Sequence, residues 1–179
     1  SKVEIRKIAD MNGLKGRFVG LASAVMAEFG VTVSPLPTSE VYSALDKGLI
    51  DFADRGDIKA NYEEGLHEVS KYLILPGVHQ PSTATSYVAN TAAYGQLDDQ
   101  QRGALEVAAR EVSGALRQDI LVANAEYTAK FEEAGVEVIM LDPADIAEAR
   151  AKAVAAWEKA TNGDALAMEM MDTQRILMK

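Results

Sequence analysis

The sequence predicts an α/β fold, in which a parallel β-sheet carries crossover helices and a long helix extends from it. Two observations lead to this prediction. Short apolar, β-branched runs alternate with helical segments through the first half of the chain. One apolar stripe then continues at helical spacing between residues 98 and 133. With 179 residues, 48% hydrophobic and 25% charged, the chain has the composition of a globular protein with a single core.

The first half of the chain is typical of a βαβαβ unit. We expect strands at residues 17–20, 31–36 and 49–53, because each run is apolar or β-branched and is bounded by glycine or proline. We expect helices at residues 22–29 and 38–45, each ended by a glycine. Strands that are joined in this order by helices lie parallel, with right-handed crossovers.

The signal is weaker in the middle of the chain. Residues 56–68 can hold a helix, and residues 71–75 form an apolar run that Pro76 stops. Residues 85–89 are expected to form a further strand.

The second half is predicted to be mostly helical. Asp98 and Gln101 have the spacing of a capping box at the start of a helix, and Gly135 follows its end. The apolar stripe of this helix comprises Leu105, Ala109, Val112, Leu116, Ile120, Ala123, Tyr127 and Phe131. At 1.5 Å per residue the helix is roughly 50 Å long, so we expect it to overhang a small domain. A strand at 136–141 and two more helices follow, the first starting at Asp142-Pro143.

Charge and cysteine content exclude several functions. The net charge is −9 and the sequence pI is about 4.7, with no basic cluster, so the sequence predicts no nucleic-acid partner and disfavours anionic membrane surfaces. The absence of cysteine excludes disulfides and thiolate metal sites. No run of apolar residues is long enough to span a membrane, and no targeting segment is visible.

Sequence signatures of catalysis are also missing. There is no phosphate-binding glycine loop, no G-x-S-x-G and no H-E-x-x-H. His67 and His79 are the only histidines, and we expect them to be partly exposed rather than joined in a zinc site, with His79 a candidate pocket residue.

Polar residues follow the predicted parallel strands, where open α/β sheets bind their ligands. Arg17 lies in the first strand, Thr38 follows the second, and Asp54 and Arg55 follow the third. The planar guanidinium of arginine matches a carboxylate through two parallel hydrogen bonds, so Arg17 is a candidate acid-binding group. From the pattern alone, a structural salt bridge at Arg17 and a solvated turn at Asp54-Arg55 remain open alternatives.

Three ordered blocks resemble a known family. They cover residues 13–22 (GLKGRFVGLA), 36–51 (LPTSEVYSALDKGLID) and 71–80 (KYLILPGVHQ), and Asn90 follows at the expected distance. These blocks are similar to the DctP-type solute-binding proteins of tripartite ATP-independent periplasmic (TRAP) transporters. The resemblance implies one lobe of a two-lobed periplasmic-binding-protein fold, type II-like, with long interlobe helices. It implies that the protein is not an enzyme. Instead, the protein is expected to capture a small organic acid in the periplasm and to deliver it to the membrane permease subunits.

The resemblance also implies roles for individual residues. Arg17 falls on the family's carboxylate-clamping arginine, and Asp54 and Arg55 fall on ligand-contacting positions. Thr38 and Gln80 fall on variable pocket positions that would tune specificity. Some members hold a metal ion that bridges to the substrate; here Asp54 would be its ligand, but Arg55 replaces the aromatic residue of those members. We therefore expect no cofactor other than such a metal, and a second cation that faces the ligand.

The resemblance divides the chain into two parts. Residues 1–97 correspond to the second, ligand-binding lobe of the family, and residues 98–179 to the crossing helix, a strand and C-terminal helices that pack between lobes. The family's N-terminal lobe has no counterpart in the chain, so we expect that lobe or a second copy of the chain as a partner. A stand-alone α/β enzyme with Asp54 as base, and an interaction module built on the long acidic helix, are the alternative functions.

Overall fold

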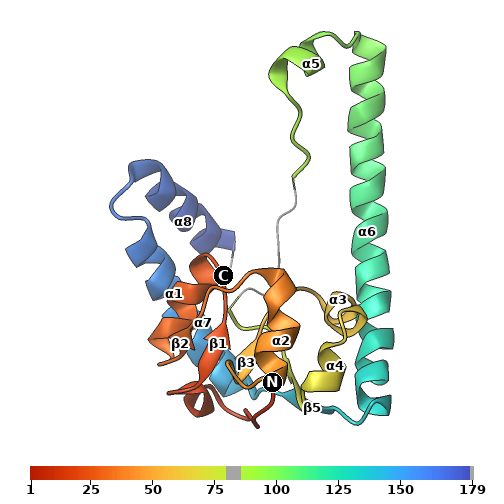
Figure 1. Ribbon diagram of the computed structural model, residues 1–179. Helices are drawn as coiled ribbons and strands as arrows, with labels where there is room; N and C mark the ends of the chain where they lie inside the picture. The colour runs from red at the N-terminus through yellow and green to blue at the C-terminus, as the bar shows by residue number, and fades with distance from the viewer. Residues whose placement is uncertain (80–85, 178–179) are drawn as a thin grey trace.

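The computed structural model describes residues 1–79 and 86–177 (Figure 1). Its helices and strands are η1 (Ile8–Met11), β1 (Lys15–Arg17), α1 (Leu21–Glu28), β2 (Thr32–Val33), η2 (Thr38–Glu40), α2 (Val41–Asp46), β3 (Phe52–Ala53), α3 (Ile58–Glu63), α4 (Leu66–Val69), β4 (Tyr72–Leu75), α5 (Thr91–Gly95), α6 (Asp99–Glu133), β5 (Glu137–Met140), α7 (Pro143–Ala160) and α8 (Ala165–Leu177). The α/β class predicted from the sequence is confirmed.

The first sheet has the strand order β2-β1-β3, and both pairs are parallel. This is the predicted βαβαβ arrangement. Its central strand covers residues 15–17 instead of the predicted 17–20, and the backbone turns at Gly20, which has φ 60°, before α1 begins. Gly16 permits close packing there, since a Cβ atom at this position would lie 2.7 Å from the Phe18 ring and 2.9 Å from the Phe52 ring.

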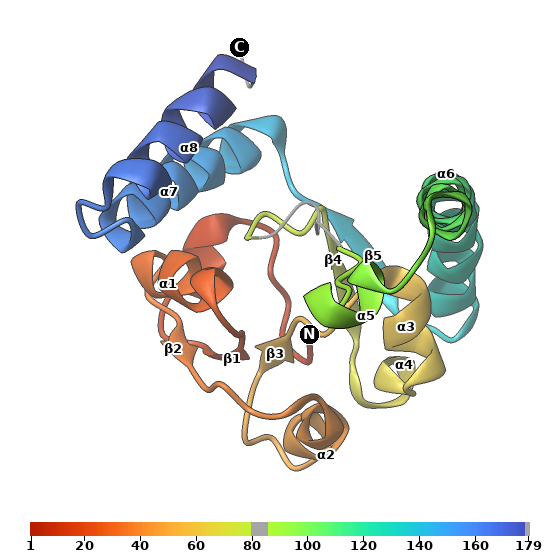
Figure 2. The ribbon, with the colours of Figure 1, turned by 90° about the horizontal axis from the view of Figure 1, so that it is seen from above.

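The second sheet joins distant parts of the sequence. β4 pairs in parallel with β5, with Tyr72 opposite Glu137 and Leu75 opposite Met140. α7 then packs against α1, with Ala149, Ala153 and Ala156 buried at the contact (Figure 2). These small side chains let the two helices approach closely. Helix α7 and Leu141, which follows β5, therefore share one hydrophobic core with the N-terminal segment, α1 and the first sheet, whereas the residues around α2 and α4 form a second, smaller cluster. We call the two sheets and the helices packed on them, with the C-terminal end of α6, the α/β body.

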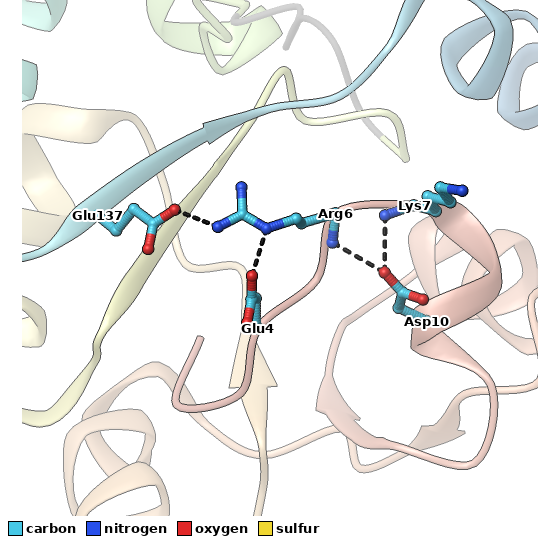
Figure 3. A network of polar contacts seen from close by, with 5 residues as sticks. All are labelled: Glu4, Arg6, Lys7, Asp10 and Glu137. Carbon is cyan, nitrogen blue, oxygen red and sulfur yellow. Dashed lines mark hydrogen bonds and ion pairs between the residues drawn. The ribbon is translucent and has the colours of Figure 1, made fainter.

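An ion-pair network fixes the N-terminal segment to the second sheet (Figure 3). The Arg6 guanidinium pairs with both Glu4 and Glu137, the first residue of β5. The Asp10 carboxylate accepts hydrogen bonds from the backbone N–H groups of Arg6 and Lys7, each at 2.9 Å. The two glutamates raise the pKa of Arg6, so this exposed arginine is charged and already paired.

The long helix α6 rises out of the α/β body, and α5 lies at its far end (Figure 1). Its predicted start is confirmed, because the Gln101 N–H donates to Asp98 Oδ1 at 2.8 Å and the Asp98 N–H donates to Gln101 Oε1 at 3.0 Å. At its other end, α6 packs against α3. No helix among the described residues combines the length and the apolar character needed to cross a membrane.

Of the predictions for the middle of the chain, one is confirmed in part and one was wrong. Residues 56–68 do hold a helix, α3, but Gly65, whose φ of 77° is left-handed, separates it from a second short helix, α4. The strand expected at 85–89 is absent over residues 86–89, and residue 85 lies outside the described residues. Tyr87 and Val88 are 63% and 92% exposed there, because no described strand lies beside them to complete a ladder.

Candidate functional site

The candidate site lies at the carboxyl ends of the first sheet. Arg17 is the last residue of β1, and its side chain joins the segments that follow the two neighbouring strands. Its Nε donates to the Leu36 carbonyl oxygen at 2.9 Å, and its Nη1 donates to the Asp54 carbonyl oxygen at 2.6 Å. Two main-chain acceptors thus fix the guanidinium at the edge where parallel sheets bind ligands.

Arg17 keeps its charge in a buried position. It is 5% exposed and is the one charged residue that is buried in the described part of the chain. Within residues 1–79 and 86–177 its guanidinium forms no ion pair with an Asp or Glu side chain. Arg6 is the opposite case, because its side chain is 54% exposed and pairs with two carboxylates (Figure 3). Carbonyl groups carry no net charge, so a buried cation held only by carbonyls favours an anion beside it.

Asp54 and His79 meet next to Arg17. Asp54 Oδ2 lies 3.2 Å from His79 Nε2, and the His79 side chain is only 10% exposed. The imidazole packs edge-on against Phe18, with ring centroids 4.9 Å apart and an interplanar angle of 72°. The sequence singles out His79 as a pocket candidate, but no spacing signal pairs it with Asp54, because the two residues follow strands of different sheets.

The other predicted site residues are placed differently. Arg55 forms an ion pair with Glu64, the residue that follows α3, and the Arg55 Nε is buried with no partner among the described residues. Thr38 is exposed at the start of η2, and its carbonyl oxygen accepts a hydrogen bond from the Val41 N–H. Gln80 lies outside the described residues.

A hollow of about 480 Å³ lies between α3, α4 and α6, and neither Arg17 nor Asp54 lines it. Several of its charged and aromatic side chains are paired with one another. The Tyr127 hydroxyl donates to Glu63 at 3.0 Å, Lys130 lies 4.0 Å from the Tyr127 ring centroid, and Tyr62 stacks on His67 at 3.9 Å. The Arg17 edge is therefore the better candidate for binding a charged ligand.

The described residues do not form a metal site by themselves. Among them, no group of three or more His, Cys, Asp or Glu side chains is placed to hold an ion. Asp54 alone offers a carboxylate beside Arg17, whereas calcium takes about six to eight oxygen ligands.

The chain belongs to the DctP family, described as bacterial extracellular solute-binding protein, family 7, whose model matches residues 1–164. It is 28% identical, over 77% of its length, to the monocarboxylate 2-oxoacid-binding periplasmic protein of Nostoc sp.. It is 30% identical, over 78% of its length, to the 2,3-diketo-L-gulonate-binding periplasmic protein of Escherichia coli. The chain covers only 38% and 42% of these relatives.

Solved structures show the same fold. A TRAP transporter solute-binding protein from Bordetella bronchiseptica, in which copurified calcium and picolinate occupy an active site, superposes with a TM-score of 0.81 at 22% identity. The match covers 98% of this chain and 54% of the Bordetella protein. The lobe fold expected from the sequence is confirmed, and the chain spans about half the length of the solved protein.

Proposed function

We propose that this chain is the carboxylate-binding lobe of a TRAP-type periplasmic solute-binding protein. The proposal is one of binding rather than turnover: a small organic acid is captured in the periplasm and passed to the permease subunits in the membrane. Family membership supports the transport role, and the relatives that bind 2-oxoacids and diketogulonate support the ligand class. The observation that carries the proposal is the buried Arg17 guanidinium, whose described partners are two main-chain carbonyls.

The Arg17 side chain is already oriented to bind an acid in the absence of the ligand. The hydrogen bonds to Leu36 and Asp54 fix the plane of its guanidinium, so little side-chain entropy remains to be lost on binding. A carboxylate beside it gains a charge-assisted contact in a site from which water is largely excluded, where such contacts are stronger than in water.

The remaining predicted residues complete the proposed site. Asp54 contributes a carboxylate that can accept a hydrogen bond from a hydroxyl of the ligand. Arg55 contributes a second cation when its ion pair with Glu64 is replaced by a contact with the ligand. Thr38 and Gln80 are proposed to tune specificity. A metal bridging to the substrate would need oxygen ligands beyond Asp54, and the ligand itself is one source of them.

The proposed partner within the protein is the other lobe of the family fold. The chain covers about half of its solved relative, and α6 extends beyond the α/β body with apolar side chains exposed. Leu105, Val112 and Leu116 are 48–53% exposed on one stripe, and the unpaired residues Tyr87 and Val88 are exposed as well. Under this proposal residues 1–97 form the ligand-binding lobe and 98–179 the crossing elements. A self-associated dimer, with no response to the other lobe, would contradict it.

Calorimetry on the protein that joins this chain to its other lobe tests the function. Loss of a charged hydrogen bond costs about 1.5–3 kcal/mol, so Arg17→Ala is expected to bind a small carboxylate such as pyruvate about 10- to 150-fold more weakly. Arg6→Ala is the matched control, because Arg6 is exposed and already paired, and it is expected to bind like the parent. An Arg17→Ala protein that binds its acid as tightly as the parent, or a parent that consumes the acid, would contradict the proposal.

A further inference from the structure

The contact between His79 and Asp54 lies directly beside the buried arginine. Asp54 takes part in both interactions through different groups: its main-chain carbonyl oxygen accepts from Arg17 at 2.6 Å, and its side-chain Oδ2 lies 3.2 Å from His79 Nε2. We propose that His79 is a positioning residue, which holds the Asp54 carboxylate away from Arg17 and so preserves the positive charge of the site. The inference deepens the proposed function, since it assumes that Arg17 is the anchor.

Asp54 is an acid well placed to neutralise Arg17. Its main chain already contacts the guanidinium, and its side chain is 37% exposed, so packing leaves room for the carboxylate to turn. A carboxylate that turned toward Arg17 would form an internal ion pair and would compete with the ligand for the same nitrogen atoms. An Nε2–H that donates to Oδ2 gives Asp54 an alternative partner. Binding of a ligand carboxylate at Arg17 therefore depends on where the Asp54 carboxylate is held.

The imidazole is itself held in place. Phe18 packs edge-on against it at 4.9 Å, and Phe18 in turn packs against Phe52 at 5.3 Å with an interplanar angle of 64°. His79 follows β4 in the second sheet, whereas Asp54 follows β3 in the first. The contact thus links the loops of two sheets, and a shift between the sheets would change the direction of the Asp54 carboxylate.

A ligand-free measurement tests the positioning role directly. The ¹⁵N resonances of the Arg17 side chain report which groups accept from it. In His79→Phe the aromatic packing on Phe18 is kept but the donor to Asp54 is lost, so these resonances are expected to move. They are expected to return in the double variant His79→Phe with Asp54→Asn, because the uncharged amide forms no ion pair with Arg17 and competes less well for its N–H groups than a carboxylate does. His67→Phe, which changes the histidine stacked on Tyr62, is the control and is expected to leave them unchanged.

Binding of pyruvate to the two-lobed protein provides the second measurement. His79→Phe is expected to bind about tenfold more weakly, and adding Asp54→Asn to it is expected to restore the affinity of the Asp54→Asn single variant. His79→Gln retains an N–H donor and is expected to keep most of the affinity, which separates loss of the contact from loss of the fold.

The two measurements distinguish a failure of the His79 positioning role from a failure of the proposed function. Arg17 resonances that do not move in His79→Phe, or a loss of affinity that Asp54→Asn does not restore, would overturn the positioning role. If the Arg17 resonances behave as expected but the parent binds no carboxylate, His79 still positions Asp54 and the proposed function is wrong.

Discussion

The two ends of α6 share one apolar stripe but have different surroundings. At the C-terminal end Phe131 is 3% exposed, and its ring meets that of Tyr62 of α3 at 5.3 Å and 83°. Toward the N-terminal end Leu105, Val112 and Leu116 are 48–53% exposed, and the helix extends away from the α/β body (Figure 1). The spacing of apolar residues therefore predicts the helix along its whole length. Burial of the apolar side chains depends on a packing partner, which the described chain supplies at one end only.

Removal of the packed aromatic ring should have the largest effect on stability. Phe131→Ala deletes a buried side chain between α6 and α3 and leaves a cavity, so we expect a loss of about 3–5 kcal/mol in the free energy of unfolding. Urea denaturation followed by circular dichroism measures it. A loss below about 1 kcal/mol would show that the packed end contributes no more than an exposed one.

Loss of the cap should affect the exposed end alone. Asp98→Ala removes the acceptor for the Gln101 N–H, which costs about 1 kcal/mol at an exposed helix start. Because this end is not packed, we expect faster amide exchange in the first turns of α6, by about fivefold, with the urea midpoint little changed. An equal change in exchange at residues 125–133 would contradict the separation of the two ends.

Truncation on the exposed stripe should be nearly neutral in this chain. Leu116→Ala removes a side chain that is 48% exposed, so its effect on the free energy of unfolding is expected within about 0.5 kcal/mol. In the protein that includes the other lobe, the same substitution is expected to cost about 2 kcal/mol or more, because a buried leucine is then lost. Equal costs in the two proteins would contradict the proposed interlobe contact.

The smallest expected effect concerns an ion pair near the packed end. The hydrogen bond from Lys130, at 2.7 Å, lowers the pKa of Glu126 below its ordinary value of 4.5. A lowered folded-state pKa adds stability above pH 4.5, and this stability is lost as pH falls through the folded-state value. Glu126→Gln should therefore lower the melting temperature slightly at pH 7. This difference should shrink as pH falls from 4.5 through the lowered folded-state pKa, and it should be smaller in high salt.

Glu111→Gln is the control for that comparison, since no ion pair joins Glu111 to another described residue. A melting-temperature difference for Glu126→Gln that did not shrink at any pH below 4.5 at which the protein stays folded would rule out the ion pair as its cause.

Local signals explain which parts of the fold the sequence predicts. The capping box at Asp98, the Asp142-Pro143 start and Gly135 act within a few residues, so the bounds of α6 and α7 follow from them. The strand expected at 85–89 depends on a neighbouring strand, which alternation of residues cannot supply. The spacing of apolar residues also did not predict the break between α3 and α4. A single left-handed residue, Gly65, separates the two helices without changing the apolar pattern.

Only part of the candidate site is predictable from the sequence. Strand ends place Arg17 and Asp54 at one edge, so their proximity follows from topology. The carbonyl partners of Arg17 and the contact between Asp54 and His79 depend on three loops that meet only in the folded chain. Arg55 was expected to face a ligand, and its ion pair with Glu64 arises from the turn at the end of α3.

A crystal structure of the two-lobed protein with a bound acid is the decisive test of Arg17 as the anchor. We expect the ligand carboxylate to lie about 2.7–2.9 Å from nitrogen atoms of Arg17, while Asp54 remains in contact with His79. An acid bound elsewhere, with Arg17 contacting only the Leu36 and Asp54 carbonyl oxygens, would contradict it.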